Sequence, residues 1–328
     1  MSNAEVAPVE IDCSARAPLP GLEILAPRDV PLGGPRAMTV RRTLPQRQRS
    51  LVGAWCFADH YGPDDVRNRP GMDVPPHPHT GLQTVSWLFA GEIEHRDSNG
   101  VHALVHPGEL NLMTAGAGIC HSEVSTPAAM VLHGVQLWVA LPDEFRHSER
   151  RFDHYAPQPV SRGDATITVF LGELAGQRSP VSTFTPLLGA QVDLPPQSTL
   201  AIEVDTDFEH GVLLDSGSLQ IAEQPVAVGE LAFQGVGRES LTMVNTGESP
   251  ARAIILGGTP FTEELLMWWN FVGRTHEEIV EYRQEWQERS SRFGSVVGYV
   301  GDPDWLPAPP LPTTRLTPRK PPTRKDVR

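Results

Sequence analysis

Short apolar segments separated by turn residues recur along most of this chain. Five follow one another between Thr84 and Ala140, with turn signals such as Asn99-Gly100 and Pro107-Gly108 between them. Eight more lie between Ile167 and Leu256. Short strands at such regular spacing are typical of an antiparallel sandwich or barrel. A content of 32 Pro and 29 Gly also disfavours long helices. We therefore expect an all-β protein with two β-rich halves.

The two sets of strands suggest a division of the 328 residues into domains. A flexible N-terminus is expected over residues 1–20, a first domain over 21–150 and a second over 165–295. Within the second domain, Thr275 to Glu278 form a capping box, which predicts a helix to about Arg289 that packs across a sheet. Residues 302–328 are Pro-rich and basic, and we expect a disordered tail there. Removal of residues 305–328 should then leave folding and metal content unchanged.

Charge and cysteine content exclude several classes of protein. The formal net charge of −13 disfavours nucleic acid as a partner, because phosphate backbones are bound through Lys and Arg. Cys13, Cys56 and Cys120 show no metal or disulfide spacing, which favours a reducing cytoplasm. The N-terminus lacks the basic start and apolar core of a signal peptide, and no apolar run is long enough for a membrane span. We expect a cytoplasmic protein without a membrane partner.

The sharpest chemical signal is a pair of short motifs, His77-Pro78-His79 and His121-Ser122-Glu123. In an extended strand, residues i and i+2 point to the same face about 6.6 Å apart, so each motif can aim two ligands at one point. The strands between the motifs leave room for the two pairs to meet across a sandwich. Ser122 and Cys120 would then point to the opposite face, where Cys120 is a packed core thiol.

Three imidazoles and one carboxylate form a donor set without thiolate. Such a set suits Fe(II), Mn, Co, Ni or Cu better than a closed structural zinc site, and Fe(II) is our first expectation. Because 12 histidines produce some His-x-His by chance, the first motif alone leaves a structural interpretation open. We assign no ligand role to the other histidines considered, which are His60, His95, His102, His106, His133 and His210. Two of them, His60 and His133, could reach the mouth of the site.

Four longer stretches resemble the pirin family of the cupin superfamily: His77 to Val85, Gly91 to Ser98, Pro107 to Glu123 and Leu132 to Val139. The resemblance extends over nearly the whole chain except its ends. It implies a bicupin, two tandem antiparallel β-sandwich (cupin) domains, with one metal, usually iron, in the N-terminal domain only. The family's ligands correspond to His77, His79, His121 and Glu123, which are also the residues selected by strand geometry.

Two positions depart from the family pattern. Thr80 stands where Arg is common, and Gln83 stands where the cupin motif has Glu. Gln83 removes a possible acid beside the site. Because that Glu is not a usual metal ligand in pirins, metal binding should survive, and the consequences should fall on rate and substrate preference.

The resemblance implies an enzymatic function, since some pirins behave as quercetin 2,3-dioxygenases. These open the central ring of a flavonol with O2 and release carbon monoxide. The expected partners are then a flavonol-like aromatic substrate and O2, with the metal as Lewis acid and template. Glu123 is the expected base for the flavonol hydroxyl.

A different class of function uses the same four ligands. Some pirins act as metal-dependent or redox-dependent regulatory proteins that bind a transcription factor or a metabolic enzyme. A dioxygenase needs an aromatic-sized pocket over the metal, whereas a redox sensor needs a surface that changes with the oxidation state. A cupin sugar isomerase ranks last, because the ligand strands offer only Arg96 for a substrate phosphate.

Overall fold

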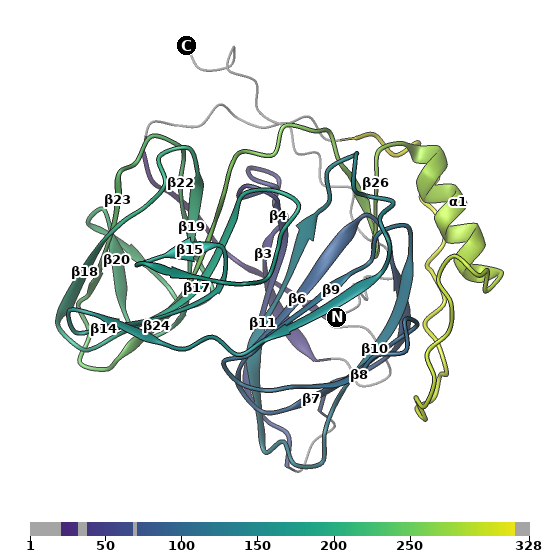
Figure 1. Ribbon diagram of the computed structural model, residues 1–328, viewed down its shortest axis with the longest axis horizontal. Coiled ribbons are helices and arrows are strands. Elements are labelled where there is room, and N and C mark those ends of the chain that lie inside the picture. The colour runs from purple at the N-terminus through teal and green to yellow at the C-terminus, as the bar shows by residue number, and fades with distance from the viewer. Residues whose placement is uncertain (1–20, 32–37, 68–70, 319–328) are drawn as a thin grey trace.

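The computed structural model describes residues 21–31, 38–67 and 71–318, so the expected flexible N-terminus lies outside the described residues. The strands form two barrels, each built from a seven-stranded sheet and a four-stranded sheet (Figure 1). The seven-stranded sheet of the first barrel consists, in spatial order, of β12 (Arg151–Tyr155), β9 (Leu110–Thr114), β6 (Leu82–Ala90), β11 (Val131–Ala140), β4 (Trp55–Asp65), β3 (Thr39–Leu44) and β2 (Arg28–Pro31). Its four-stranded sheet consists of β5 (Asp73–His79), β10 (Ile119–Ser125), β7 (Ile93–Asp97) and β8 (His102–Val105).

The second barrel repeats this arrangement. Its seven-stranded sheet consists of β1 (Glu23–Leu25), β22 (Leu231–Gln234), β19 (Glu209–Ser216), β24 (Ala251–Gly258), β17 (Leu187–Leu194), β14 (Ala165–Leu171) and β13 (Val160–Arg162). Its four-stranded sheet consists of β18 (Ser198–Glu203), β23 (Ser240–Asn245), β20 (Leu219–Ile221) and β21 (Gln224–Val226). Two small ribbons complete the strands: β15 (Glu173–Leu174) with β16 (Gln177–Arg178), and β25 (Leu266–Trp268) with β26 (Phe271–Gly273).

The two seven-stranded sheets pack against each other between the barrels. The largest apolar cluster joins Trp87 and Leu137 of the first barrel to Phe170, Leu213 and Ile254 of the second. Burial of apolar surface contributes about 25 cal/mol per Å², so this contact holds the two barrels together as one body. The resulting order of layers is a four-stranded sheet, two seven-stranded sheets and a second four-stranded sheet.

The second barrel contains one strand from the N-terminal end of the described chain. The N-terminal strand β1 pairs with β22 of the second barrel, whereas β12, which follows the first barrel in sequence, pairs with β9 of the first. Within the expected first domain of 21–150, β1 therefore belongs to the sheet of the second barrel. β12 lies between the two expected domains and extends the sheet of the first barrel.

The chain after the second barrel returns to the first one. The helix α1 (His276–Gln287) begins at the expected capping box of Thr275 and Glu278. An apolar cluster joins the helix residues Tyr282 and Trp286 to Phe271 and to Cys120 of β10, so the helix covers the outer face of the four-stranded sheet (Figure 1). Cys120 is a buried free thiol on that face, as expected.

The expectation of a disordered tail over residues 302–328 is wrong for its described part, residues 302–318, which packs against the rest of the protein. Leu316 is buried. The backbone N–H of Leu306 donates to Pro76 O, and the backbone oxygen of Leu306 accepts from Trp286 Nε1. Apolar side chains among the prolines explain the difference, because they pack against aromatic rings of α1. Residues 319–328 lie outside the described part of the chain.

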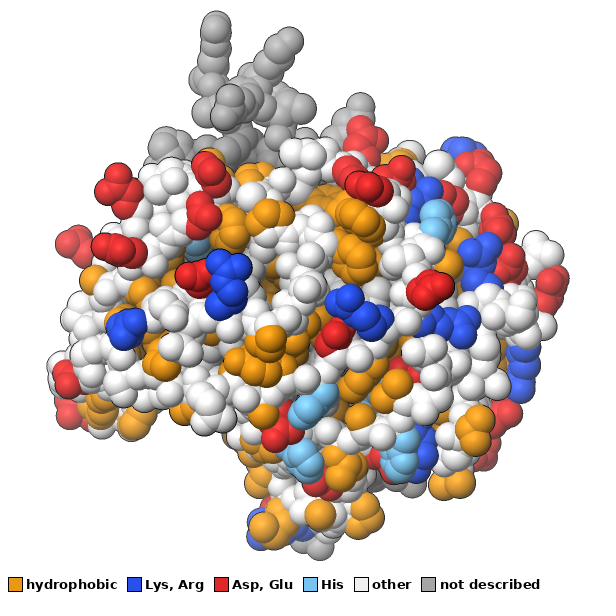
Figure 2. Space-filling view, viewed as in Figure 1, with side chains coloured by type: hydrophobic (Ala, Val, Ile, Leu, Met, Phe, Trp, Pro, Cys, Tyr) orange, Lys and Arg blue, Asp and Glu red, His pale blue; other side chains and the backbone are white. Residues whose placement is uncertain are grey.

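The all-β architecture with one helix near the end is confirmed. Within the described ranges, no helix is both long enough and apolar enough to cross a membrane. On the face shown in Figure 2, Lys and Arg side chains are interspersed with Asp and Glu.

Candidate metal centre

The two histidine motifs lie on neighbouring strands of one sheet. β5 and β10 are antiparallel, and the register places His77 opposite His121 and His79 opposite Ile119. A β-bulge between His121 and Glu123 shifts the register there. The pairs therefore meet across adjacent strands of the four-stranded sheet, and the expectation that they meet across a sandwich is wrong. Cross-strand neighbours have Cβ atoms about 5 Å apart, which brings the rings together without a long reach.

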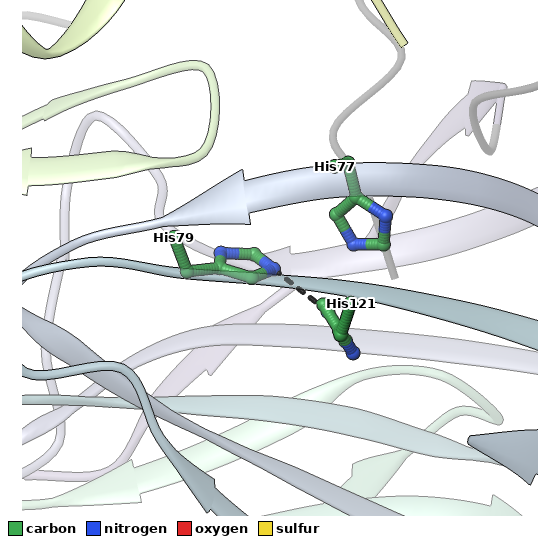
Figure 3. Close-up of side chains that lie close together, drawn as sticks. All are labelled: His77, His79 and His121. Atoms are coloured by element: carbon green, nitrogen blue, oxygen red, sulfur yellow. Dashed lines mark hydrogen bonds between the residues drawn. The ribbon is translucent and has the colours of Figure 1, made fainter. Parts of the chain in front are cut away.

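Three imidazoles converge inside the first barrel (Figure 3). One ring nitrogen each of His77, His79 and His121 lies within 4.8 Å of the other two. The Nε2 atoms of His79 and His121 are 3.1 Å apart, and the ring centroids of His77 and His121 are 4.3 Å apart. All three side chains are fully buried.

The opposite ring nitrogens are held by the surrounding protein. Nδ1 of His77 lies 2.8 Å from the backbone oxygen of Pro75, and Nδ1 of His79 lies 3.3 Å from that of Asn270. Because a carbonyl oxygen only accepts, both Nδ1 atoms carry the hydrogen and both Nε2 atoms keep a free lone pair. Nδ1 of His121 faces Nδ1 of His95 at 3.4 Å. An outer partner that fixes the tautomer in this way is the usual support of a metal-ligating histidine.

Burial keeps these imidazoles neutral. It lowers the pKa of His77, His79 and His121 well below 6.5, and for His121 the adjacent rings of His77 and His79 lower the pKa further. Neutral imidazole is the form that binds a metal ion. At neutral pH the three Nε2 lone pairs are therefore available together.

Glu123 lies beside this trio rather than within it. Its carboxylate forms a second candidate group with His95 and His121, in which the ligand atoms lie within 4.8 Å of one another. Ser86 of β6 donates a hydrogen bond of 3.1 Å to Glu123 Oε1. His121 belongs to both groups, so the two motifs share one region of the barrel interior.

His95 is a member of this region that the sequence analysis left out. Its Nε2 lies 3.3 Å from Asp97 Oδ2, and Asp97 also accepts from the backbone N–H groups of Asn99 and Val101. The contact with His121 arises because β7 pairs with β10, with Glu123 opposite His95. The sequence offered one signal for His95, the His-x-Asp pattern on β7. This pattern could not show that β7 pairs with β10, which carries His121.

The residues fit a bound metal ion on two grounds. The donor set consists of imidazole and carboxylate groups from which the thiol of Cys120 points away. In addition, Nε2 of His77 is buried without a hydrogen-bond partner among the described residues. Leaving a buried polar atom unsatisfied costs about 1–3 kcal/mol, so a ligand at this atom would remove a real penalty.

A second histidine cluster lies between the barrels and has a different character. His60 Nε2 and His133 Nε2 lie 2.7 and 2.6 Å from the same oxygen of Asp215, and Arg252 donates to the other oxygen at 2.7 Å. Nε of Arg41 lies 3.3 Å from Nδ1 of His60. Two guanidinium groups oppose a further cation here. The suggestion that His60 and His133 reach the mouth of the metal site is wrong, because they join the two barrels.

The two departures from the family pattern occupy defined places. Gln83 is fully buried and donates to Thr114 Oγ1 at 2.9 Å. Thr80 is also buried, and its Oγ1 donates to Val272 O at 3.5 Å. Each side chain is therefore part of the packing around the site.

Comparison with known proteins identifies the family. The chain matches the model described as Pirin over residues 37–139 and the model described as Pirin C-terminal cupin domain over residues 189–294. A Pseudomonas aeruginosa protein named "Putative quercetin 2,3-dioxygenase" is 43% identical over 293 residues, which cover 89% of this chain and 91% of the relative. The chain belongs to the pirin family. Its two barrels are the two cupin domains of a pirin.

Solved structures support the same assignment. A crystal structure of quercetin 2,3-dioxygenase from Acinetobacter baumannii has a TM-score of 0.83 and 36% identity, and it covers 90% of this pirin and 98% of that chain. The bacterial pirin YhhW from Escherichia coli, solved in complex with nickel(II), has a TM-score of 0.58 and 15% identity, with 74% of this chain and 100% of that chain covered. At that identity the second likeness supports the fold alone.

Proposed function

We propose that this pirin is a mononuclear metal protein in which His77, His79, His121 and Glu123 are the ligands. The observation that carries the proposal is the convergence of the three imidazoles, with the Nδ1 atoms of His77 and His79 each held by a backbone carbonyl oxygen. The buried, unpartnered Nε2 of His77 supports the same assignment. Glu123 is included because it lies in the second candidate group together with His121, which also belongs to the trio.

The proposed metal is Fe(II), with Ni, Mn, Co or Cu as alternatives. Imidazole and carboxylate donors suit all of these ions, and the donor set alone favours none of them strongly. The nickel complex of the Escherichia coli pirin concerns that protein, and supports only the inclusion of nickel among the candidates.

The proposed reaction is the opening of a flavonol ring by O2 with release of carbon monoxide. It is supported by the two relatives whose names carry quercetin 2,3-dioxygenase. When bound, the metal would supply a Lewis acid for the oxygen atoms of the substrate.

The chain's own residues have definite parts in this proposal. Glu123 is the base that takes the proton of the flavonol hydroxyl. Ser86 donates a hydrogen bond to Oε1 of Glu123 and so helps to orient the carboxylate that takes this proton. The pairing of Pro75 and Asn270 with the two β5 histidines keeps their Nε2 atoms directed inward.

The test begins with metal analysis of the purified protein, followed by anaerobic Fe(II) loading and a quercetin assay. Loss of flavonol absorbance together with carbon monoxide release is expected, and His77→Ala should abolish both. His102→Ala is a matched control, since this β8 histidine is half exposed and pairs with Glu94. Bound iron without turnover would favour the regulatory, metal-dependent binding function, and absence of any bound metal would exclude both functions.

A further inference from the structure

The strand that carries His77 and His79 lies at the edge of its sheet. β5 pairs with β10 on one side only, since the order of the sheet is β5-β10-β7-β8. An edge strand presents unpaired N–H and C=O groups and is more easily displaced than a central strand. Two proposed ligands therefore depend on whatever covers the free edge of β5.

Residues from beyond the second barrel contact this edge at several points. Tyr299 Oη donates to Asp73 Oδ1 at 2.8 Å, at the start of β5. The N–H of Leu306 donates to the oxygen of Pro76 at 2.8 Å, directly before His77. We call residues 266–317 the C-terminal strap, since they run from β25 through α1 and along the free edge of β5.

At the end of β5, the contact reaches a proposed ligand itself. The N–H of Val272 donates to Thr80 O at 3.1 Å, and the oxygen of Asn270 accepts from Nδ1 of His79 at 3.3 Å. The close approach requires glycine at position 81, where a Cβ atom would lie 2.4 Å from the oxygen of Val272. The β25–β26 ribbon is thus fitted against the residues that follow His79.

The turn of this ribbon stores backbone strain. Trp269 has a φ of +53°, a left-handed conformation that bulky residues rarely adopt and that costs of order 1–3 kcal/mol. The neighbouring rings of Trp268 and Phe271 are buried in the cluster under α1, and Asn270 is fully buried. The conformation at Trp269 turns the chain so that the oxygen of Asn270 faces His79.

Within the strap, the helix fixes the extended segment that follows it. Trp286 Nε1 donates to Leu306 O at 2.8 Å, Arg283 Nε donates to Pro309 O at 2.7 Å, and Leu316 N donates to His276 Nδ1 at 3.1 Å. Each contact joins α1 to the extended chain after residue 303. The helix therefore holds the extended segment of the strap in place along β5.

We propose that the C-terminal strap is a positioning element for the metal site, and that its docking and metal binding are coupled. The strap fixes β5 and the tautomer of His79, so a metal bound by His77 and His79 favours the docked strap, and the docked strap favours metal binding to the same extent. The inference rests on the proposed metal site but not on the proposed reaction. It reverses the earlier expectation that removal of residues 305–328 leaves metal content unchanged.

The first test compares Leu306→Pro with Leu306→Ala by competition of the full-length protein with a chelator for Co(II). Proline removes the N–H that Pro76 accepts, whereas alanine keeps it and removes only the side chain. We expect Leu306→Pro to bind Co(II) about tenfold more weakly than Leu306→Ala. This is the smaller end of the loss of metal affinity that follows when residues supporting a metal ligand are changed. Equal affinities in the two variants would overturn the proposal.

The second test uses the wild-type chain, so it does not depend on the folding of a variant. Loading with Co(II) should slow hydrogen exchange at the amides of Val272 and Leu306 about tenfold, and should leave the amides of β18 in the second barrel unchanged. A purely structural strap would show no such response to metal, and unchanged exchange at both amides would refute the coupling. Neither readout involves turnover, so an inactive but metal-binding protein would remove only the proposed reaction.

Discussion

Nε2 of His79 lies 3.1 Å from Nε2 of His121, although both nitrogens lack a hydrogen in the tautomers that their Nδ1 partners favour. For His79 this tautomer follows from the carbonyl oxygen of Asn270. For His121 it follows from His95, because Nε2 of His95 donates to Asp97 Oδ2 and Nδ1 of His95 then accepts from Nδ1 of His121. Two lone pairs at this separation repel unless a cation or a proton lies between them. The relationship makes the metal-free site unfavourable in itself, and several measurable consequences result.

Metal binding should raise thermal stability. At a free metal concentration about 100-fold above the dissociation constant, the folded state gains about 2.7 kcal/mol. Because the unfolding entropy of a chain of this size is about 0.7 kcal/mol/K, we expect a rise in Tm of about 4 °C over the chelator-treated protein. Differential scanning calorimetry measures it, and His77→Ala should show no rise with metal. A rise of equal size in that variant would place the stabilising metal elsewhere.

Glu123→Gln should lower metal occupancy and abolish turnover. The amide keeps the size of the side chain but removes the negative charge and the proton acceptor, which are the two properties that the proposal uses. Metal analysis and the quercetin assay measure the two effects separately. Glu94→Gln is the control, since this carboxylate on β7 is partly exposed and pairs with Arg96. Wild-type turnover in Glu123→Gln would remove Glu123 from the mechanism.

Ser86→Ala should reduce turnover by about tenfold while most of the bound metal is retained. The hydroxyl contacts both Glu123 Oε1 and Gln136 Oε1, at 3.1 and 2.9 Å, and its loss removes one of the contacts that orient the carboxylate. Ser122→Ala is a matched control on β10, because Ser122 is also buried and is adjacent in sequence to His121 and Glu123. Similar losses in the two variants would indicate a packing effect rather than orientation of Glu123.

Local features of the fold could be predicted from the sequence, because their causes are local. Alternation of apolar residues located most strands of the two large sheets, and the capping box at Thr275 and Glu278 located the start of α1. The pairing of the N-terminal strand β1 with β22 of the second barrel could not be predicted. These strands lie about 200 residues apart, and pairing partners at that separation are set by non-local contacts.

The candidate site shows the same division. His77, His79 and His121 were recognisable from residue type and spacing. His95 was left out because its contact with His121 depends on the pairing of β7 with β10. Asn270 supplies a backbone oxygen, and a backbone group has no signature of residue type. The tail was misjudged because proline and basic residues dominate its composition, whereas a few leucines decide how it packs.

Asp215→Asn should weaken the contact between the barrels without changing metal content. Burial alone would raise the pKa of Asp215, but hydrogen bonds from His133 and His60 lower it well below its ordinary value, and Arg252 lowers it further. Loss of the charge leaves Arg252 without its carboxylate, and breaking a buried ion pair typically costs about 3–5 kcal/mol. Urea unfolding measures the loss. Metal content should not change, because the cluster faces the second barrel; a parallel loss of metal would show that the two sites are linked.

Finally, His210 should make stability depend on pH in the acidic range. Burial lowers its pKa from 6.5 to about 4, and both ring nitrogens lack a hydrogen-bond partner among the described residues. Between these two pKa values the unfolded chain binds a proton that the folded protein does not, so stability is complete above about pH 6.5 and falls as the pH is lowered towards about 4. The loss attributable to His210 is about 2 kcal/mol at pH 5.

His210→Leu should remove this part of the pH dependence. Subtracting the free energies of unfolding of the two proteins cancels the contribution of the three proposed metal-site histidines, because they are distant from His210. Urea unfolding at about pH 7.5 and about pH 5 provides the comparison, and parallel losses in both proteins would contradict the assignment to His210.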